Sequence, residues 1–200
     1  MNLITRFMSQ FTDTYETRSE IADKDIYFFF ISEGKKNVIK VVLYYYEASF
    51  NGEPLYSLAL SDYDVFTDTY SIDKTTDNGD VYKIFHTVLS TILQFFLLRQ
   101  NATLMIQGID SSQEFQDKCH KACDRNCSLD VCRKAHRRIN IYSNYVNANF
   151  ENLTKEYVLS GSTSSHENKL FTEDYILGKK YLTILIKKRK FDTNDIQRQP

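Results

Sequence analysis

Residues 26–47, IYFFFISEGKKNVIKVVLYYYE, form two runs of aromatic and β-branched residues separated by a short polar segment. Such residues are enriched in strands, so residues 26–33 and 38–47 predict a β-hairpin that turns at Gly34-Lys35-Lys36. Both faces of these strands are largely apolar. This pattern indicates that helices cover at least one face of the sheet.

Sequence next to this hairpin predicts a third strand and one long helix. Asn51-Gly52 is a turn signal, and residues 55–60 after it predict a strand. Apolar residues then recur at helical spacing, which predicts a helix from about residue 80 to residue 98. We expect its N-cap to be Asp77 or Asn78.

The second half of the chain predicts further strands and a pair of helices. Strand signals occur at 103–107, 157–159 and 181–187, residues 112–150 predict helices with a break, and residues 160–165 predict a loop. Strands and helices do not alternate as in repeated βαβ units. We therefore expect an α+β fold, with a mainly antiparallel twisted sheet packed by the long apolar helix and a later helical hairpin.

Length and composition predict that residues 1–200 form a single α+β domain. The hydrophobic share is 42%, and two prolines and six glycines leave no room for a low-complexity linker. Residues 1–20 predict an N-terminal amphipathic helix, because apolar residues recur there at helical spacing. We expect residues 112–136 to be a cysteine-containing helical insertion.

Charge is distributed unevenly along the chain. Residues 1–80 carry 14 acids and 7 bases, a net of −7, whereas residues 81–200 carry 12 acids and 18 bases, a net of +6. This asymmetry permits a polyanion partner on the second half, and charge pairing within one fold is the alternative.

Neither the N-terminal segment nor the long apolar segment predicts a membrane protein. The N-terminus lacks the apolar core of a signal peptide. Residues 81–98 contain Lys83, His86 and Gln94, so we expect this segment to be too short and too polar to span a bilayer. These observations predict a cytoplasmic chain with reduced thiols.

Short motifs are spread along most of the chain in a fixed order. They are F-x-x-S-x-G at 29–34 with Ile39-Lys40 after it, residues 58–62, Asn78-Gly79-Asp80 before an apolar helix, a strand ending at Gly108, residues 138–142 opening a helix, and a closing strand ending in Lys187-Lys188-Arg189. In these motifs residues 26–190 resemble a family of bacterial proteins classed only as a domain of unknown function. The resemblance implies a fold and no activity. The chain departs from simpler members between Gly108 and Arg138, where all its cysteines lie.

The four cysteines lie within residues 119–132, CHKACDRNCSLDVC. One straight helix would place Cys132 on the side opposite the other three, because each residue advances by about 100°. A break with an N-cap at Ser128 instead gives two helices, each with a ligand pair at i and i+4. The predicted ligands of a structural zinc ion are Cys119, Cys123, Cys132 and His136, with Cys127 as an alternative. Two other readings stay open, namely thiols packed as small apolar residues and disulfides.

Basic residues gather around the same segment and extend into the following helix. Bases attract phosphates and tyrosines stack on nucleobases, so this stretch is a candidate surface for single-stranded nucleic acid. A protein partner is the alternative for the same surface. The candidate residues are Lys121, Arg125, Arg133, Lys134, Arg137, Arg138 and Tyr142.

No catalytic motif for hydrolysis or phosphate binding occurs in the sequence. The aspartate-rich residues 61–80 are read as a solvated loop rather than a cation site. We therefore expect an uncharacterised, non-enzymatic binding module for a protein or nucleic-acid partner, with zinc as a structural cofactor. The alternative is a hydrolase-type enzyme that uses a Cys/His site or the aspartate-rich loop.

Overall fold

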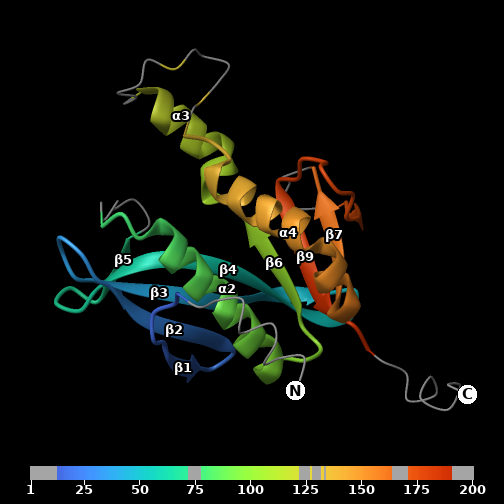
Figure 1. The fold of residues 1–200 in the computed structure, drawn as a ribbon, viewed down its shortest axis with the longest axis horizontal. Helices are drawn as coiled ribbons and strands as arrows, with labels where there is room; N and C mark the ends of the chain where they lie inside the picture. The colour runs from blue at the N-terminus through green and yellow to red at the C-terminus, as the bar shows by residue number, and fades with distance from the viewer. Residues whose placement is uncertain are drawn as a thin grey trace, which may run out of the picture. The chain divides into compact units, whose positions relative to one another are not determined.

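The computed structural model describes residues 13–71, 78–121, 127, 132, 134–163 and 171–190. Within them lie three α-helices, one short 3-10 helix and nine strands, and every strand pairing inside a unit is antiparallel. This confirms the predicted α+β class. The chain divides into two compact units, Met1–Ala102 and Thr103–Pro200 (Figure 1).

The first unit contains five strands joined in chain order. They are β1 (Arg18–Ala22), β2 (Asp25–Ser32), β3 (Val38–Phe50), β4 (Glu53–Asp64) and β5 (Thr69–Ser71). The predicted hairpin of β2 and β3 is confirmed. So is the turn at Asn51-Gly52, where φ is 51° and 79°; positive φ at both positions is typical of the tightest hairpin turns.

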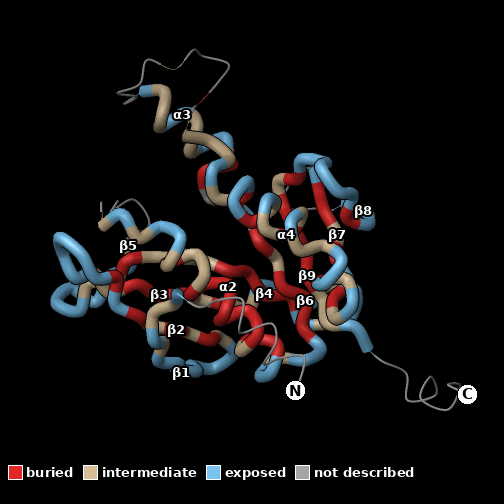
Figure 2. Tube along the Cα trace, viewed as in Figure 1, coloured by how far each residue is buried: buried red, intermediate tan, exposed pale blue. Residues whose placement is uncertain are grey.

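Helix α2 (Val81–Leu98) packs on one face of this sheet, which we call the inner face (Figure 1). Side chains alternate along a strand, so Phe28 and Tyr44 point to the same face. The Tyr44 ring stacks on Phe95 of the helix at 4.6 Å between centroids. The Tyr44 hydroxyl also hydrogen-bonds with Thr91 Oγ1 at 2.8 Å. Buried residues accordingly follow the central strands and the helix (Figure 2).

The predicted N-terminal helix over residues 1–20 is wrong for its last part. Residues 13–17 have no regular structure, and β1 pairs with β2 from Arg18 onward. Residues 1–12 lie outside the described residues. All of β1 is exposed, so its polar sequence RSEIA becomes a strand through backbone pairing and not through burial.

The aspartate-rich residues 61–80 also differ from the predicted loop. Strand β4 continues to Asp64, beyond the predicted end at residue 60, and β5 returns along it. The reason is cross-strand pairing with the full length of β3, which a short apolar run does not reveal. Residues 72–77 lie outside the described residues.

Helix α2 is long and apolar enough to cross a membrane when judged by length and composition alone, contrary to the sequence expectation. The core helix of a soluble protein passes the same test. Ten of its residues are buried, and Phe95 and Phe96 are among the most buried side chains in the chain. Packing against the inner face therefore accounts for the apolar residues of the helix that are buried.

The second unit contains four strands in the order β6-β9-β7-β8. Its elements are β6 (Thr103–Gln107), the 3-10 helix η1 (Ile109–Ser111), α3 (Gln113–Lys121), α4 (Arg137–Glu156), β7 (Tyr157–Ser162), β8 (Glu173–Asp174) and β9 (Thr183–Lys188). Helix α4 contacts β6, β7 and β9 and buries Ile139, Tyr142, Val146 and Leu153. The predicted loop at 160–165 is wrong for residues 160–162, which continue β7 opposite β9.

The second helix of the predicted hairpin begins later than expected. Residues 134–136 form a turn, and α4 begins at Arg137 rather than near residue 128. Its start is set by Asp110 of η1, whose Oδ2 accepts a hydrogen bond from the Arg138 backbone N–H at 3.0 Å. A carboxylate distant in sequence thus satisfies a helix-terminal donor that a local cap residue was expected to satisfy.

The ring of Phe95 provides the test of this packing. It also meets Tyr56 at 5.2 Å, so Phe95→Ala should lower the free energy of unfolding by about 3–5 kcal/mol. Leu97→Ala, at an exposed position of the same helix, should change it by less than about 0.5 kcal/mol. Urea denaturation followed by circular dichroism measures both. Similar losses in the two variants would contradict the assigned inner face.

Candidate functional site

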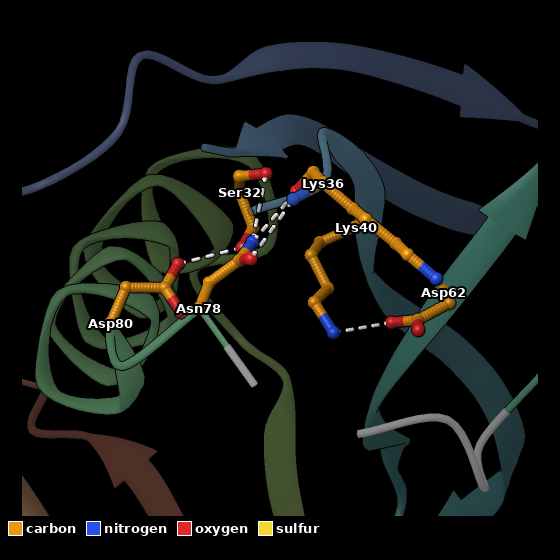
Figure 3. Close-up of polar contacts among 6 residues, drawn as sticks. All are labelled: Ser32, Lys36, Lys40, Asp62, Asn78 and Asp80. Carbon is orange, nitrogen blue, oxygen red and sulfur yellow. Dashed lines mark hydrogen bonds and ion pairs between the residues drawn. The ribbon is translucent and has the colours of Figure 1, made fainter. Parts of the chain in front are cut away.

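A polar cluster lies where β2 ends and α2 begins (Figure 3). Ser32 Oγ donates a hydrogen bond to Asp80 Oδ2 at 2.6 Å, and the Tyr15 hydroxyl donates to the same oxygen at 2.8 Å. Burial, and then this hydrogen bond to Asp80, raise the pKa of the Tyr15 hydroxyl. One carboxylate therefore ties the N-terminal segment and β2 to the first turn of the helix.

Asn78 joins the loop after β2 to this cluster. Its Nδ2 donates to Ser32 Oγ at 3.0 Å and to the Lys36 carbonyl at 2.9 Å. A Cβ added at Gly34 would lie 2.5 Å from Asn78 Cγ, so the amide approaches the loop through the space that glycine leaves. This explains why glycine stands in the turn of the predicted hairpin.

The predicted helix cap is therefore wrong in its residue. The N-cap position of α2 is Asp80, and no side chain there caps the helix. Asn78 instead holds the loop after β2, and Asp77 lies outside the described residues. A side chain that the local sequence predicts to cap the helix instead makes tertiary hydrogen bonds.

A buried ion pair lies next to the cluster on the inner face. Lys40 and Asp62 are directly opposite each other on β3 and β4, and Lys40 Nζ donates to Asp62 Oδ1. The two side chains are only 9% and 10% exposed. Asp62 Oδ2 is buried and has no hydrogen-bond partner among the described residues. Removing either partner of so buried an ion pair would leave an uncompensated buried charge, which strongly destabilises a fold.

This polar cluster holds elements together, and its geometry does not favour catalysis. Ser32 is 0% exposed, and its hydroxyl proton is donated to Asp80 and not to a base such as histidine. A buried serine so occupied is not positioned to attack a substrate. The contacts fix the start of α2 on the sheet.

The aspartates that are described in residues 61–80 have separate partners. Asp64 Oδ1 accepts the Phe66 backbone N–H at 2.9 Å, and Asp68 Oδ1 accepts the Tyr63 hydroxyl at 2.9 Å. Across the described part of the chain, no group of three or more His, Cys, Asp and Glu side chains is placed to hold a metal ion. Asp73 and Asp77 lie outside that part.

The predicted zinc ligands are only partly described. Cys119 lies on α3, and Cys127 and Cys132 lie outside helices, with Cys132 buried. His136 precedes α4 with φ of 60°, so the predicted helical pairing of Cys132 with His136 is wrong. Cys123 lies outside the described residues. Zinc binding therefore stays a prediction, together with its two alternatives.

In the predicted basic patch, the tyrosine expected to stack on nucleobases is buried. Lys121 and Arg137 are exposed, Lys134 and Arg138 are half-buried, and Arg125 and Arg133 lie outside the described residues. Tyr142 is 8% exposed in the core of the second unit. Burial raises the pKa of its hydroxyl, and nearby Arg138 partly offsets this. Its ring is consequently not available to stack on a nucleobase.

The outer face of the first sheet, opposite α2, carries aromatic residues that the sequence analysis did not single out. Ile31, Ile39, Tyr63 and Tyr70 stand directly opposite one another across β2, β3, β4 and β5. Ile31 and Tyr70 are each 49% exposed. The alternation of side chains along β2 and β3 could have indicated an exposed second face. The row across the strands, however, depends on their register, which the sequence does not give.

A highly exposed phenylalanine lies in the turn that joins the last two strands of the first unit. Phe66 sits in the turn between β4 and β5 and is 99% exposed. Asp64 holds the turn by accepting the backbone N–H groups of Phe66 and Thr67. Such an Asx-type turn restrains the backbone of the residue that carries this exposed ring.

Comparison with protein families matches residues 11–115 to a family described as "Family of unknown function (DUF6934)". No curated protein and no solved structure matches the chain. The polar cluster and the outer face both lie inside the matched residues. The first cysteine, Cys119, lies beyond them.

The buried ion pair yields a test of the cluster. Lys40→Met should lower the free energy of unfolding by about 3–5 kcal/mol, because it leaves a buried carboxylate without its cation. The double variant Lys40→Met/Asp62→Leu should regain most of that loss. Lys36→Met, at an exposed lysine nearby, is the control and should shift stability by about 0.5 kcal/mol or less. Equal stabilities of the single and double variants in urea denaturation would contradict a coupled pair.

Proposed function

We propose that this chain, which belongs to the family of unknown function DUF6934, is a non-enzymatic binding module that docks a protein partner on the outer face of its first sheet. Structural zinc in the cysteine-containing segment is part of the proposal. The observation that carries the docking surface is Phe66, an almost fully exposed phenylalanine on a fixed turn.

Large apolar side chains at a protein interface contribute most when they insert into a pocket of the partner. Phe66 suits this role because its backbone N–H is bound by Asp64, so less backbone freedom is lost on binding. Its neighbour Val65 is also exposed. Both residues lie in the turn between β4 and β5, next to the strands that carry Tyr63 and Tyr70.

The outer face itself supplies the flanking surface. Its row from Ile31 to Tyr70 crosses four strands and is apolar or aromatic at each position. Contiguous apolar surface that remains exposed is typical of interaction sites. Helix α2 occupies the inner face. Among the described residues of this unit, no second helix covers the outer face.

A protein partner fits this face better than a nucleic acid does. Residues 1–80 carry a net charge of −7, which repels phosphates. The basic residues lie in the second half of the chain, where Tyr142 is buried and cannot stack on bases. Nucleic-acid binding by the basic residues is the second candidate, and the experiment below separates the two.

Site-specific photo-crosslinking in cells tests the docking face. A photoreactive benzoyl-phenylalanine replaces Phe66 or Ile31, and in the matched control it replaces Tyr82, an exposed residue on α2. Positions 66 and 31 should yield adducts with the same protein, identified by mass spectrometry, and position 82 should not. Phe66→Ser should abolish the adduct formed from position 31, because the anchor is lost.

Two outcomes would contradict a protein-docking module. One is the same set of adducts from all three positions. The other is salt-sensitive binding of a single-stranded oligonucleotide that Arg137→Glu/Arg138→Glu abolishes and Phe66→Ser leaves unchanged, because each neutralised phosphate releases counterions. That result would favour the polyanion reading of the second unit.

A further inference from the structure

Four aromatic rings from three strands form one continuous group on the outer face. The rings of Tyr27 and Phe29 lie parallel at 6.2 Å, Phe29 meets Tyr63 edge-on at 5.8 Å, and Tyr63 lies 5.2 Å from Tyr70. Residues two apart on a strand share a face, and the register places the other two rings beside them. The group therefore offers several π faces and hydroxyls at one place.

A carboxylate lies beside this group. Glu20 on β1 stands directly opposite Tyr27. Burial first, and charges including Glu20, raise the pKa of the hydroxyls of Tyr27 and Tyr70; for Tyr63 the hydrogen bond to Asp68 comes first and Glu20 also contributes. Glu20 therefore lies near hydroxyls from three different strands, although its charge contributes least to each pKa shift. Its negative charge adds to the negative potential of the ring faces.

No cation among the described residues lies over these four rings. Elsewhere this chain covers tyrosine rings with its own lysines: Lys24 lies 4.4 Å from the Tyr46 ring centre and Lys83 lies 4.2 Å from that of Tyr15. Arg18 stands opposite Phe29 on the edge strand, is exposed, and makes no cation–π contact there. Among the described residues, no lysine of the chain therefore covers the faces of these four rings.

We propose that Tyr27, Phe29, Tyr63, Tyr70 and Glu20 form an aromatic cage for the ammonium or guanidinium group of a basic segment in the partner protein. This inference rests on the docking face proposed above and names the chemistry of its partner. Charge complementarity points to a basic segment, because residues 1–80 carry a net charge of −7. Phe66 is the apolar anchor at the edge, and the cage supplies selectivity for positive charge.

A defined peptide tests the cage. The probe is a short fluorescein-labelled peptide of alternating glycine and lysine, and its matched control has every lysine acetylated. Fluorescence anisotropy with the full chain should detect binding of the lysine peptide and much weaker binding of the acetylated one. Tyr27→Leu and Tyr63→Leu keep apolar area and net charge but remove the π face, and each should weaken binding about three- to thirty-fold. Glu20→Gln should weaken it as well.

Matched variants separate the cage from general electrostatic attraction. Glu16→Gln removes the same charge at an exposed residue outside the sheet, and Tyr82→Leu removes an exposed ring on α2. Both should leave the affinity unchanged. Arg18→Gln should leave it unchanged or increase it, because it removes a competing cation. Urea denaturation of each variant shows that the fold is retained.

Other outcomes would overturn the cage. One is absence of binding of the lysine peptide; another is equal weakening by Glu16→Gln and Glu20→Gln. Self-association of the chain that Glu20→Gln weakens would assign the cage to a second copy rather than to a partner. If crosslinking from position 66 identifies a partner but Tyr27→Leu leaves the peptide affinity intact, the docking face stands and the cage does not.

Discussion

Stacking of Tyr44 on Phe95 joins helix α2 to one face of the first sheet, and the choice of face determines which side chains remain at the surface. The helix buries Phe28, Val42 and Tyr44 on the inner face. Because side chains alternate along each strand, Tyr27, Phe29 and Ile31 must then point to the other side. One packing contact thus creates both the core and the aromatic outer face.

The polar cluster makes this arrangement specific. Packing of apolar residues allows a helix to slide on a sheet, whereas buried hydrogen-bonding groups must meet their own partners. Ser32, Asn78 and Asp80 satisfy one another only when the first turn of α2 stands at the end of β2 (Figure 3). The Lys40–Asp62 pair adds the same requirement between β3 and β4. The register that aligns the outer aromatic row is therefore held by polar contacts on the inner side.

The sequence predicts the helices and strands of this chain better than it predicts the tertiary contacts between them. The β2–β3 hairpin, the Asn51-Gly52 turn and helix α2 are predicted from local periodicity and turn residues, because each depends on neighbours in the chain. The start of α4 depends on Asp110, and the role of Asn78 depends on a loop across the sheet, so no local pattern reveals them. The cage needs the register of all five strands from β1 to β5. No local pattern therefore reveals its residues, whereas the basic stretch is evident from the sequence because its charges lie within 18 residues of one another.

The docking function requires that the outer face is exposed to solvent in the full chain. Hydroxyl-radical footprinting with mass spectrometry measures this exposure directly. Oxidation rates of Phe66 and Tyr70 are compared with those of Tyr44 and Phe28, which are buried beneath α2. An open face predicts fast oxidation of Phe66 and Tyr70 and slow oxidation of the two buried residues. Protection of Phe66 and Tyr70 to the level of Tyr44 would show that another part of the chain covers this face, and would contradict its role as a docking surface.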